Sequence, residues 1–377
     1  MPSFLLEVEM KEKIKILHVQ LTGNFGGIES LLTNVYEKID RNKFQFDFIA
    51  TEKEPYQRKL EDLGAKVYVM PSMKHFVRYL RKFNSILNSN YDVVHFHKNS
   101  AANIVPILFA KFHSSHPKII VHSHNTSPSF NNKGLIILHK FNRIFLNKIL
   151  NKRVACSNSA AKWMFGTLTN VQIINNGIDV DKFTFSTADR SAIRKKYHIR
   201  RDDYLLGTVG RLTKQKNHKM TINIFNEIKK TYPNVKLMII GDGYLKENIT
   251  KQVLNLGIEN DVIFLGVQLE VNKYLSAMDA FIMPSLYEGL GIAAIEAQSE
   301  GLPTYISENF PNEVNLTTLI HSFSLSEKPQ DIAQMIINNS HKKSIRNAND
   351  SMKVRNSNYS LESTVKSFTK LYQGILK

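Results

Sequence analysis

Short apolar runs alternate with amphipathic stretches along most of the chain, and this alternation is the main structural signal in the sequence. In the first half, the expected strands are residues 13–20, 44–50, 66–70, 92–95, 118–122, 153–156 and 171–174. Helical patterns, with apolar positions three and four residues apart, separate these runs. Because strands that alternate with helices form parallel, doubly wound sheets, the pattern predicts an α/β fold.

The same alternation continues in the second half of the chain. Apolar runs at Leu205, Val235, Val262 and Phe281 each lead into a loop that carries glycine or polar residues. A chain of 377 residues is expected to form two domains. The polar, charged segment from Thr184 to Asp203 is expected to be the linker between them.

The stretch from Phe281 to Glu296 has the form of an anion site. A buried strand ends at Pro284, a loop with two glycines follows, and a helix begins at Ile292. The first N–H groups of a helix lack internal partners and attract anions, and glycine allows a ligand to approach the backbone. On one helix, Glu288 and Glu296 would lie about 12 Å and roughly 80° apart. The two carboxylates are expected to hold two ends of one extended ligand; the alternative is that both are simply solvated.

A loop at the start of the second half supplies positive charge. Gly210 ends a strand, and Arg211 and Lys216 flank the loop that follows. A guanidinium can grip two phosphate oxygens and an ammonium adds a compact charge, so this pair suits a diphosphate. Basic loop residues are more often only solvated, and the spacing alone leaves that alternative open.

Taken together, these motifs resemble the donor site of the retaining family 4 glycosyltransferases, which have the GT-B fold. The matching residues are Pro284-Ser285, Tyr287-Glu288-Gly289, Gly291, Glu296-Ala297, Gly301-Leu302-Pro303, the G-R-x-x-x-x-K pattern at 210–216 and the N-G-I-D-x-x-x-F segment at 176–183. The resemblance covers most of the chain and thins beyond Pro303. It implies an α/β protein of the GT-B type, with two Rossmann-like, doubly wound domains and a cleft between them.

The resemblance also implies domain bounds and residue roles. Residues 1–185 would bind the acceptor, residues 186–359 would bind the donor, and a last helix, 360–377, would cross back to the first domain. The expected catalytic residues are His124, Glu288, Arg211 and Lys216, with Glu288 holding sugar hydroxyls rather than acting as a nucleophile. The expected donor-binding residues are Gly26, Gly27, Arg211, Lys216, Gly241, Leu265, Glu288, Gly289, Leu290, Gly291 and Glu296. His97 and Asn125 are expected on the acceptor side.

Two histidine pairs stand at the ends of expected strands: His95 with His97, and His122 with His124. A spacing of two residues places each pair on one face of its strand, at the carboxyl end where α/β folds bind ligands. Four imidazoles also fit a metal hydrolase, but hydrolases with an H-x-H motif of this type are eight-fold barrels, which this pattern does not predict. We therefore expect no metal, and His95 and His122 remain open between a structural and a binding role.

Gly26 and Gly27 follow the first expected strand, where an α/β fold places a ligand loop. The loop is not G-x-G-x-x-G, and no acidic residue ends the second strand, so a dinucleotide-binding dehydrogenase is not expected. The resemblance implies that this loop meets the donor diphosphate. By themselves, the two glycines also fit a tight turn.

A net charge of +17 favours an anionic partner. No helix-turn-helix, RNA-binding or zinc-finger pattern occurs, so nucleic acid is not expected. Two basic amphipathic segments, 73–87 and 134–150, fit contact with an anionic membrane, although each also fits an ordinary helix with a solvated basic face. No apolar run is long enough to span a bilayer, residues 1–12 do not resemble a signal peptide, and the single cysteine, Cys156, suits a reducing cytoplasm.

We therefore expect a retaining glycosyltransferase that moves a sugar from a nucleotide-diphosphate donor, a UDP-sugar, to a glycan or polyprenyl-diphosphate-linked acceptor. A similarity to transferases of bacterial exopolysaccharide and capsule synthesis implies a cytoplasmic enzyme on the inner face of the plasma membrane. No cofactor and no metal are expected, because Arg211, Lys216 and helix ends balance the donor charge. The alternatives are a sugar-nucleotide 2-epimerase on the same fold and a non-enzymatic basic protein that binds membrane or nucleic acid.

Overall fold

The computed structural model describes residues 13–21, 26–53, 57–125, 132–340, 346 and 348–376. The chain divides into an N-terminal unit, Met1–Asn176 with Leu361–Lys377, and a C-terminal unit, Gly177–Ser360. The division falls at Asn176 rather than at residue 185, because Ile178, Val180 and Phe183 pack into the core of the C-terminal unit. The N-terminal segment 1–12 and residues 22–25 of the first loop lie outside the described residues.

The N-terminal unit is built on a seven-stranded parallel sheet with the order β3-β2-β1-β4-β5-β6-β7. Its strands are β1 Ile14–Leu21, β2 Phe44–Ala50, β3 Val67–Val69, β4 Val93–Lys98, β5 Lys118–Ser123, β6 Lys152–Ala155 and β7 Val171–Ile173. Its helices are α1 Gly27–Lys38, α2 Gln57–Asp62, α3 Phe76–Leu87, α4 Val105–Lys111, α5 Lys133–Ile149, α6 Asn158–Phe165 and α14 Leu361–Ile375. Each strand expected in this half is present, which confirms the doubly wound pattern.

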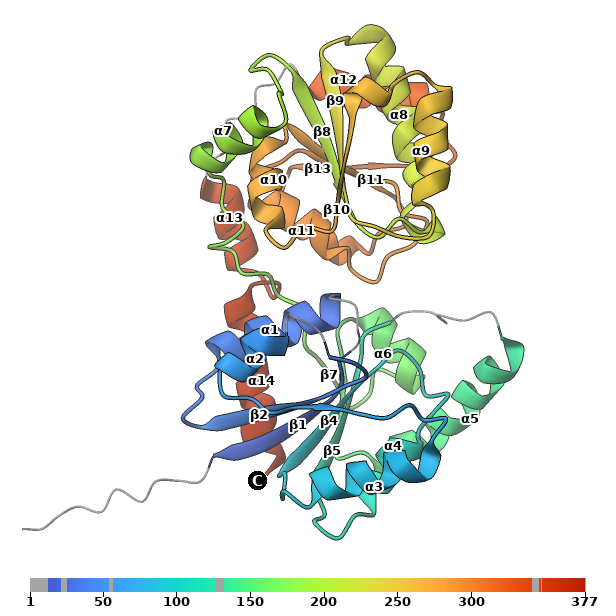
Figure 1. The fold of residues 1–377 in the computed structure, drawn as a ribbon, viewed down its shortest axis with the longest axis vertical. Coiled ribbons are helices and arrows are strands. Elements are labelled where there is room, and N and C mark those ends of the chain that lie inside the picture. Colours follow the sequence, from blue (N-terminus) through green and yellow to red (C-terminus); the bar gives the residue numbers. More distant parts are fainter. Residues whose placement is uncertain are drawn as a thin grey trace, which may run out of the picture. The chain divides into compact units, whose positions relative to one another are not determined.

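Helices cover both faces of this sheet (Figure 1). On one face, α1 and α14 pack with the aromatic residues of β2, and Tyr36, Phe46 and Tyr372 lie in one apolar cluster. On the other face, Phe83 of α3 and Ile107 of α4 belong to a second cluster. The last helix of the chain is therefore part of the core of the N-terminal unit.

The C-terminal unit has a six-stranded parallel sheet with the order β10-β9-β8-β11-β12-β13. Its strands are β8 Tyr204–Val209, β9 Val235–Ile240, β10 Val262–Gly266, β11 Ala280–Met283, β12 Thr304–Ser307 and β13 Ile320–Phe323. Its helices are α7 Thr187–Lys196, α8 His218–Thr231, α9 Lys246–Asn255, α10 Val271–Ala277, α11 Ile292–Ser299, α12 Pro329–Ser340 and α13 Ala348–Arg355, with short 3₁₀ turns at η1 Lys214–Lys216, η2 Glu259–Asp261 and η3 Asn312–Val314.

The expectation of a linker from Thr184 to Asp203 is wrong. This segment contains α7, whose Arg190 and Arg194 donate to the two oxygens of Asp279 at 2.6 and 3.1 Å. The same carboxylate accepts from the backbone N–H of Leu205 at 2.7 Å. The charged residues that made the segment look like a solvated linker are thus paired against α10 and the first strand of this sheet.

Each sheet has one point at which the strand order reverses. In the N-terminal unit this point lies between β1 and β4, and in the C-terminal unit it lies between β8 and β11. Ligands of open parallel sheets bind beyond the carboxyl ends of the strands at such a point. The topology therefore directs attention to the loops that follow these four strands.

Candidate active site

The carboxyl ends of β10, β9, β8 and β11 carry most of the donor residues expected from the sequence. Leu265 stands near the end of β10, Gly241 follows β9, and Arg211 follows β8. The loop after β11 contains Glu288 and Gly289. Because these four strands are consecutive neighbours in a parallel sheet, their loops meet at one edge.

Lys216 and Glu288 form an ion pair across the switch point between β8 and β11. The Lys216 ammonium lies 2.7 Å from the Glu288 carboxylate, and the two side chains are 17% and 6% exposed. The two loops are tied together just before this pair. Gln215 accepts from the N–H of Leu286 at 2.8 Å, and its side chain donates to the carbonyl of Tyr287 at 3.0 Å.

Glycines allow this edge to be compact. The stem of Lys216 lies over Gly210, so that a Cβ at Gly210 would be 3.3 Å from two of its carbons. Gly241 has a φ of +133°, and a Cβ there would lie 2.1 Å from the carbonyl oxygen of Gly210. A side chain at Gly241 would therefore force the loop that carries Arg211 and Lys216 away from the sheet.

Arg211 carries a second positive charge in the loop that contains Lys216. Its side chain is exposed, and its guanidinium has no hydrogen-bond or ion-pair partner within the described parts of the chain. A guanidinium without a partner is suited to bind an incoming anion in two contacts.

The Gly289–Gly291 turn leads into α11. Leu290 is buried, and Gly291 has a φ of +80° and caps the helix. A Cβ on Gly291 would lie 2.2 Å from Cε1 of Phe310, so both the backbone and the packing require glycine. The turn thus has the strand–loop–helix form that the sequence predicts.

Glu296 lies in α11, where its side chain is only partly exposed. Burial raises the pKa of its carboxyl to about 7, and the positive charge of Lys182 acts in the opposite direction. The carboxyl is therefore poised to gain or lose a proton near neutral pH, and hydrogen-bond donors on a ligand would favour its charged form.

In the N-terminal unit, His97 and His124 lie together. His97 is fully buried at the end of β4, and its Nδ1 is 2.9 Å from Nε2 of His124, which follows β5. Burial lowers the pKa of His124 to about 3, so its ring is neutral at physiological pH. Asn125 comes next in the chain, and Thr126 lies outside the described residues.

The two glycines of the first loop differ from those of the C-terminal unit. Gly26 caps α1, and its N–H donates to Glu29 at 3.1 Å. A Cβ on Gly27 would meet no atom within 4 Å. Local packing in the described residues therefore does not require glycine at position 27.

The sequence analysis did not identify some residues that lie near these sites. His18 on β1 joins the histidines of β4, and Tyr372 of α14 contacts them. His218, next to the Lys216 turn, is buried, and neither ring nitrogen has a hydrogen-bond partner in the described structure. The position of His18 on a buried strand was a usable signal, whereas nothing local in the sequence indicates Tyr372.

Comparison with known proteins identifies the family. Residues 25–182 match the family described as Glycosyltransferase Family 4, and residues 189–349 match the one described as Glycosyl transferases group 1. EpsF of Bacillus subtilis (strain 168), named as a glycosyltransferase, is 31% identical over 328 residues, which cover 83% of this chain and 84% of EpsF. The chain belongs to the family 4 glycosyltransferases. It is therefore an enzyme that transfers glycosyl groups, and the epimerase and non-enzymatic alternatives are set aside.

Two further comparisons extend over nearly the whole glycosyltransferase. An Escherichia coli enzyme named UDP-Gal:α-D-GlcNAc-diphosphoundecaprenol α-1,3-galactosyltransferase is 25% identical over 310 residues, covering 78% of this chain and 79% of that enzyme. The structure of Anabaena HepE with UDP and glucose superposes with a TM-score of 0.80 at 18% identity, covering 96% of this chain and 99% of HepE. The structural likeness confirms the GT-B fold. Among the described helices of this glycosyltransferase, none is both long and apolar enough to cross a bilayer.

Proposed function

We propose that this glycosyltransferase moves a sugar from a UDP-sugar, with retention, to a lipid-linked glycan in the synthesis of a cell-surface polysaccharide. The observation that carries the proposal is the Lys216–Glu288 pair at the switch point, with the exposed Arg211 in the same loop as Lys216. It places two cations and a carboxylate where a parallel sheet receives its ligand. The names of the Escherichia coli relative and of the HepE complex support a UDP-sugar and a diphosphoundecaprenol acceptor.

In the proposed reaction, the donor diphosphate is held by Arg211, Lys216 and the backbone of the Gly289–Gly291 turn. The bond between the anomeric carbon and the diphosphate oxygen breaks, and negative charge grows on the leaving diphosphate. Cations placed there stabilise the transition state more than the ground state. No metal ion is assigned to this step, because the two side chains supply the positive charge.

Glu288 is assigned to binding the sugar and is not assigned as a nucleophile. Its carboxylate is 6% exposed and already accepts from Lys216, so it offers its remaining lone pairs to sugar hydroxyl groups. Glu296 is assigned to the hydroxyls at the other end of the donor. The backbone at Gly241 and Leu265 is assigned to the nucleotide, and Gly26 and Gly27 to the diphosphate.

The N-terminal unit is assigned to the acceptor. His124, with Asn125 and His97, stands at the carboxyl ends of β4 and β5. Its neutral ring can accept or donate one hydrogen bond, which suits contact with a sugar hydroxyl. The acceptor oxygen would form the new bond to the anomeric carbon on the face from which the diphosphate leaves, and its proton would pass to the leaving diphosphate oxygen. Attack on that face gives retention.

Helix α5 supports the proposal that the acceptor is linked to a lipid. Only His139 and Leu146 of this helix are buried. It is held by polar contacts: the His139 ring accepts from Ala101, while the Asn142 side chain donates to Ala101 and Ala102. The exposed apolar residues are Leu135, Ile137, Leu138, Phe141, Ile144 and Phe145.

This arrangement reverses the usual order, in which the apolar face of a surface helix packs on the core. Lys133, Lys140, Arg143 and Lys148 add positive charge to the same helix. Figure 1 shows α5 at the edge of the N-terminal unit. We assign this face to the surface of an anionic membrane, on the cytoplasmic side where a nucleotide-sugar is available. Helix α3, with exposed Phe76 and Val77, presents a smaller patch of the same kind.

The test is nucleotide release from a panel of nucleotide-sugars, with and without a lipid-linked acceptor. One UDP-sugar is expected to release UDP, and the Glu288→Ala variant is expected to lose this release while Glu313→Ala, an exposed control, retains it. Stabilisation by UDP without release would support the donor site and point to the acceptor as the missing component. No release and no binding of any nucleotide would overturn the proposal, and an epimerised nucleotide-sugar formed without acceptor would do the same.

A further inference from the structure

A cluster of five histidines lies inside the N-terminal unit. Strand register explains it: His18 on β1 is opposite His95 on β4, and His97 on β4 is opposite His122 on β5. Since side chains two residues apart share a face, His124 joins the same group. Ring contacts with Phe368 and Tyr372 show that α14 covers this face.

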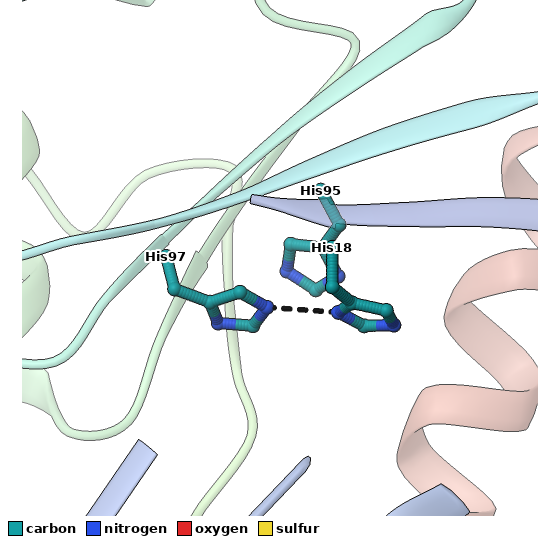
Figure 2. Close-up of side chains that lie close together, drawn as sticks. All are labelled: His18, His95 and His97. Atoms are coloured by element: carbon teal, nitrogen blue, oxygen red, sulfur yellow. Dashed lines mark hydrogen bonds between the residues drawn. The ribbon is translucent and has the colours of Figure 1, made fainter. Parts of the chain in front are cut away.

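Three of these rings lie close together, with interplanar angles of 17°, 25° and 31°. Figure 2 shows His18, His95 and His97 together, with the rings of His18 and His97 joined by a hydrogen bond of 2.9 Å between Nδ1 and Nε2. One nitrogen from each of the three lies within 4.8 Å of the other two. All three side chains are at most 1% exposed, and Nε2 of His95 has no hydrogen-bond partner in the described structure.

The other nitrogen of each ring has a partner. Nδ1 of His95 is 2.8 Å from the hydroxyl of Tyr372, and Nε2 of His18 is 3.5 Å from the same oxygen. Nδ1 of His97 is 2.9 Å from Nε2 of His124. Histidines that bind metals have one nitrogen toward the ion and the other donating to a neighbouring group. The proton that lies between Nδ1 of His18 and Nε2 of His97 would therefore have to move to the other nitrogen of its ring when an ion binds.

We propose that His18, His95 and His97 bind one divalent transition-metal ion, with Zn²⁺ the best fit. Three imidazoles without a carboxylate suit zinc and its neighbours rather than magnesium or calcium. Zinc–nitrogen bonds of about 2.0–2.1 Å require ligand nitrogens roughly 3.3 Å apart in a tetrahedron, so the His18 and His97 rings would separate by a few tenths of an ångström. The fourth position of the ion would take water.

A neutral imidazole offers one lone pair, so each of the three rings can supply one ligand to an ion. The ion would link β1 and β4 and, through Tyr372, the returning helix α14, so its role would be structural.

The trio His97, His122 and His124 also has close nitrogens. We assign the ion to His18, His95 and His97 because the second nitrogen of each of these rings has a hydrogen-bond partner. In the other trio, neither nitrogen of His122 has a hydrogen-bond partner among the described residues. The choice between the two trios can be tested directly.

The experiment uses the full chain without a polyhistidine tag, freed of metal by a chelator and titrated with Co²⁺. One equivalent is expected to produce the visible absorption of tetrahedral cobalt, and Zn²⁺ is expected to remove it and raise the melting temperature. His18→Gln and His95→Gln are expected to lose the absorption. His139→Gln, which changes a buried histidine outside the cluster, is expected to keep it.

Absence of the cobalt absorption in the wild-type chain would overturn the proposal and leave a hydrogen-bonded histidine cluster. Absorption that survives His18→Gln but disappears in His122→Gln would overturn the assignment to this trio. If the substituted chains do not fold, zinc X-ray absorption of the wild-type protein still decides. It is expected to show three imidazole nitrogens at about 2.0–2.1 Å, and any other ligand set would contradict the site.

Discussion

The ammonium of Lys216 lies 2.7 Å from the carboxylate of Glu288, although 72 residues separate them in the chain. Both residues follow strands that are neighbours at the reversal of strand order. The pair holds a cation and a hydrogen-bond acceptor at a fixed separation before any donor arrives. Such preorganisation lowers the reorganisation needed at the moment of reaction.

Lys216→Ala and Glu288→Ala are each expected to lower kcat by about 10²–10³-fold, because each removes a group that we propose to contact the reacting donor. Because the two side chains form one unit, the double variant is expected to lose much less than the product of the single losses. The measurement is steady-state UDP release by the four proteins of this cycle. Lys214→Ala, an exposed lysine on the same turn, is the control and is expected to be near wild type. Multiplicative losses would show that the pair does not act together.

Gly291→Ala is expected to destabilise the C-terminal unit by about 2–4 kcal/mol, through left-handed backbone strain and overpacking. The added methyl group would meet the ring of Phe310 at 2.2 Å. Adding Phe310→Leu is expected to recover the packing part of the loss but not the backbone part. Gly374→Ala in α14 is the control, since a Cβ there meets no atom within 4 Å. Urea denaturation measures all three, and equal effects at positions 291 and 374 would contradict the explanation.

The contribution of Glu296 to stability is expected to be lost as the pH rises from about 4.5 to about 7, while buried histidines such as His18 and His124, whose pKa is lowered, make stability rise over part of the same range. The folded-state pKa of Glu296 is raised from 4.5 to about 7, mainly by burial. A group whose pKa is higher in the folded state contributes stability below the unfolded pKa, and that contribution is lost as the pH passes the folded pKa. Glu300, whose pKa burial also raises to about 7, acts in the same direction.

Melting temperature against pH tests this linkage. The melting temperature of Glu296→Gln is expected to increase relative to that of the wild-type protein as the pH rises from 4.5 to 7, because the amide has no proton to lose. Glu313→Gln, at an exposed site, is expected to follow the wild-type curve. Parallel curves for the wild-type protein and Glu296→Gln would show that this carboxyl does not titrate as described.

Ile137→Ser with Phe141→Ser is expected to weaken binding to anionic phospholipid vesicles by roughly ten-fold or more, from the lost burial of two apolar side chains. The two residues are 68% and 57% exposed, so the fold is expected to be unaffected. Co-sedimentation with anionic and zwitterionic vesicles measures the effect. Leu254→Ser, at an apolar residue that is 56% exposed on α9, is the control. Unchanged sedimentation of the double variant would remove α5 from the membrane contact.

The sequence by itself determined the elements and most of the motifs. Short apolar runs that alternate with helical patterns are typical of a parallel sheet covered by helices on both faces. The alternation of the two patterns therefore predicts the strands directly. The same local rule places His95 with His97, and His122 with His124, on one face of a strand. The glycine at position 291 and the spacing of Arg211 and Lys216 can also be recognised within short stretches of sequence. The motifs that contain them indicated the family that the comparisons confirm.

Tertiary structure decided which of these local features meet. The contact of Lys216 with Glu288 depends on β8 lying beside β11, and the site of His18 depends on its register opposite His95. Strand order and register arise from the packing of the whole sheet, so no local pattern contains them. For the same reason the charged segment around Arg194 was mistaken for a linker. Its charges are satisfied by Asp279, a residue far along the chain that only the folded unit brings to it.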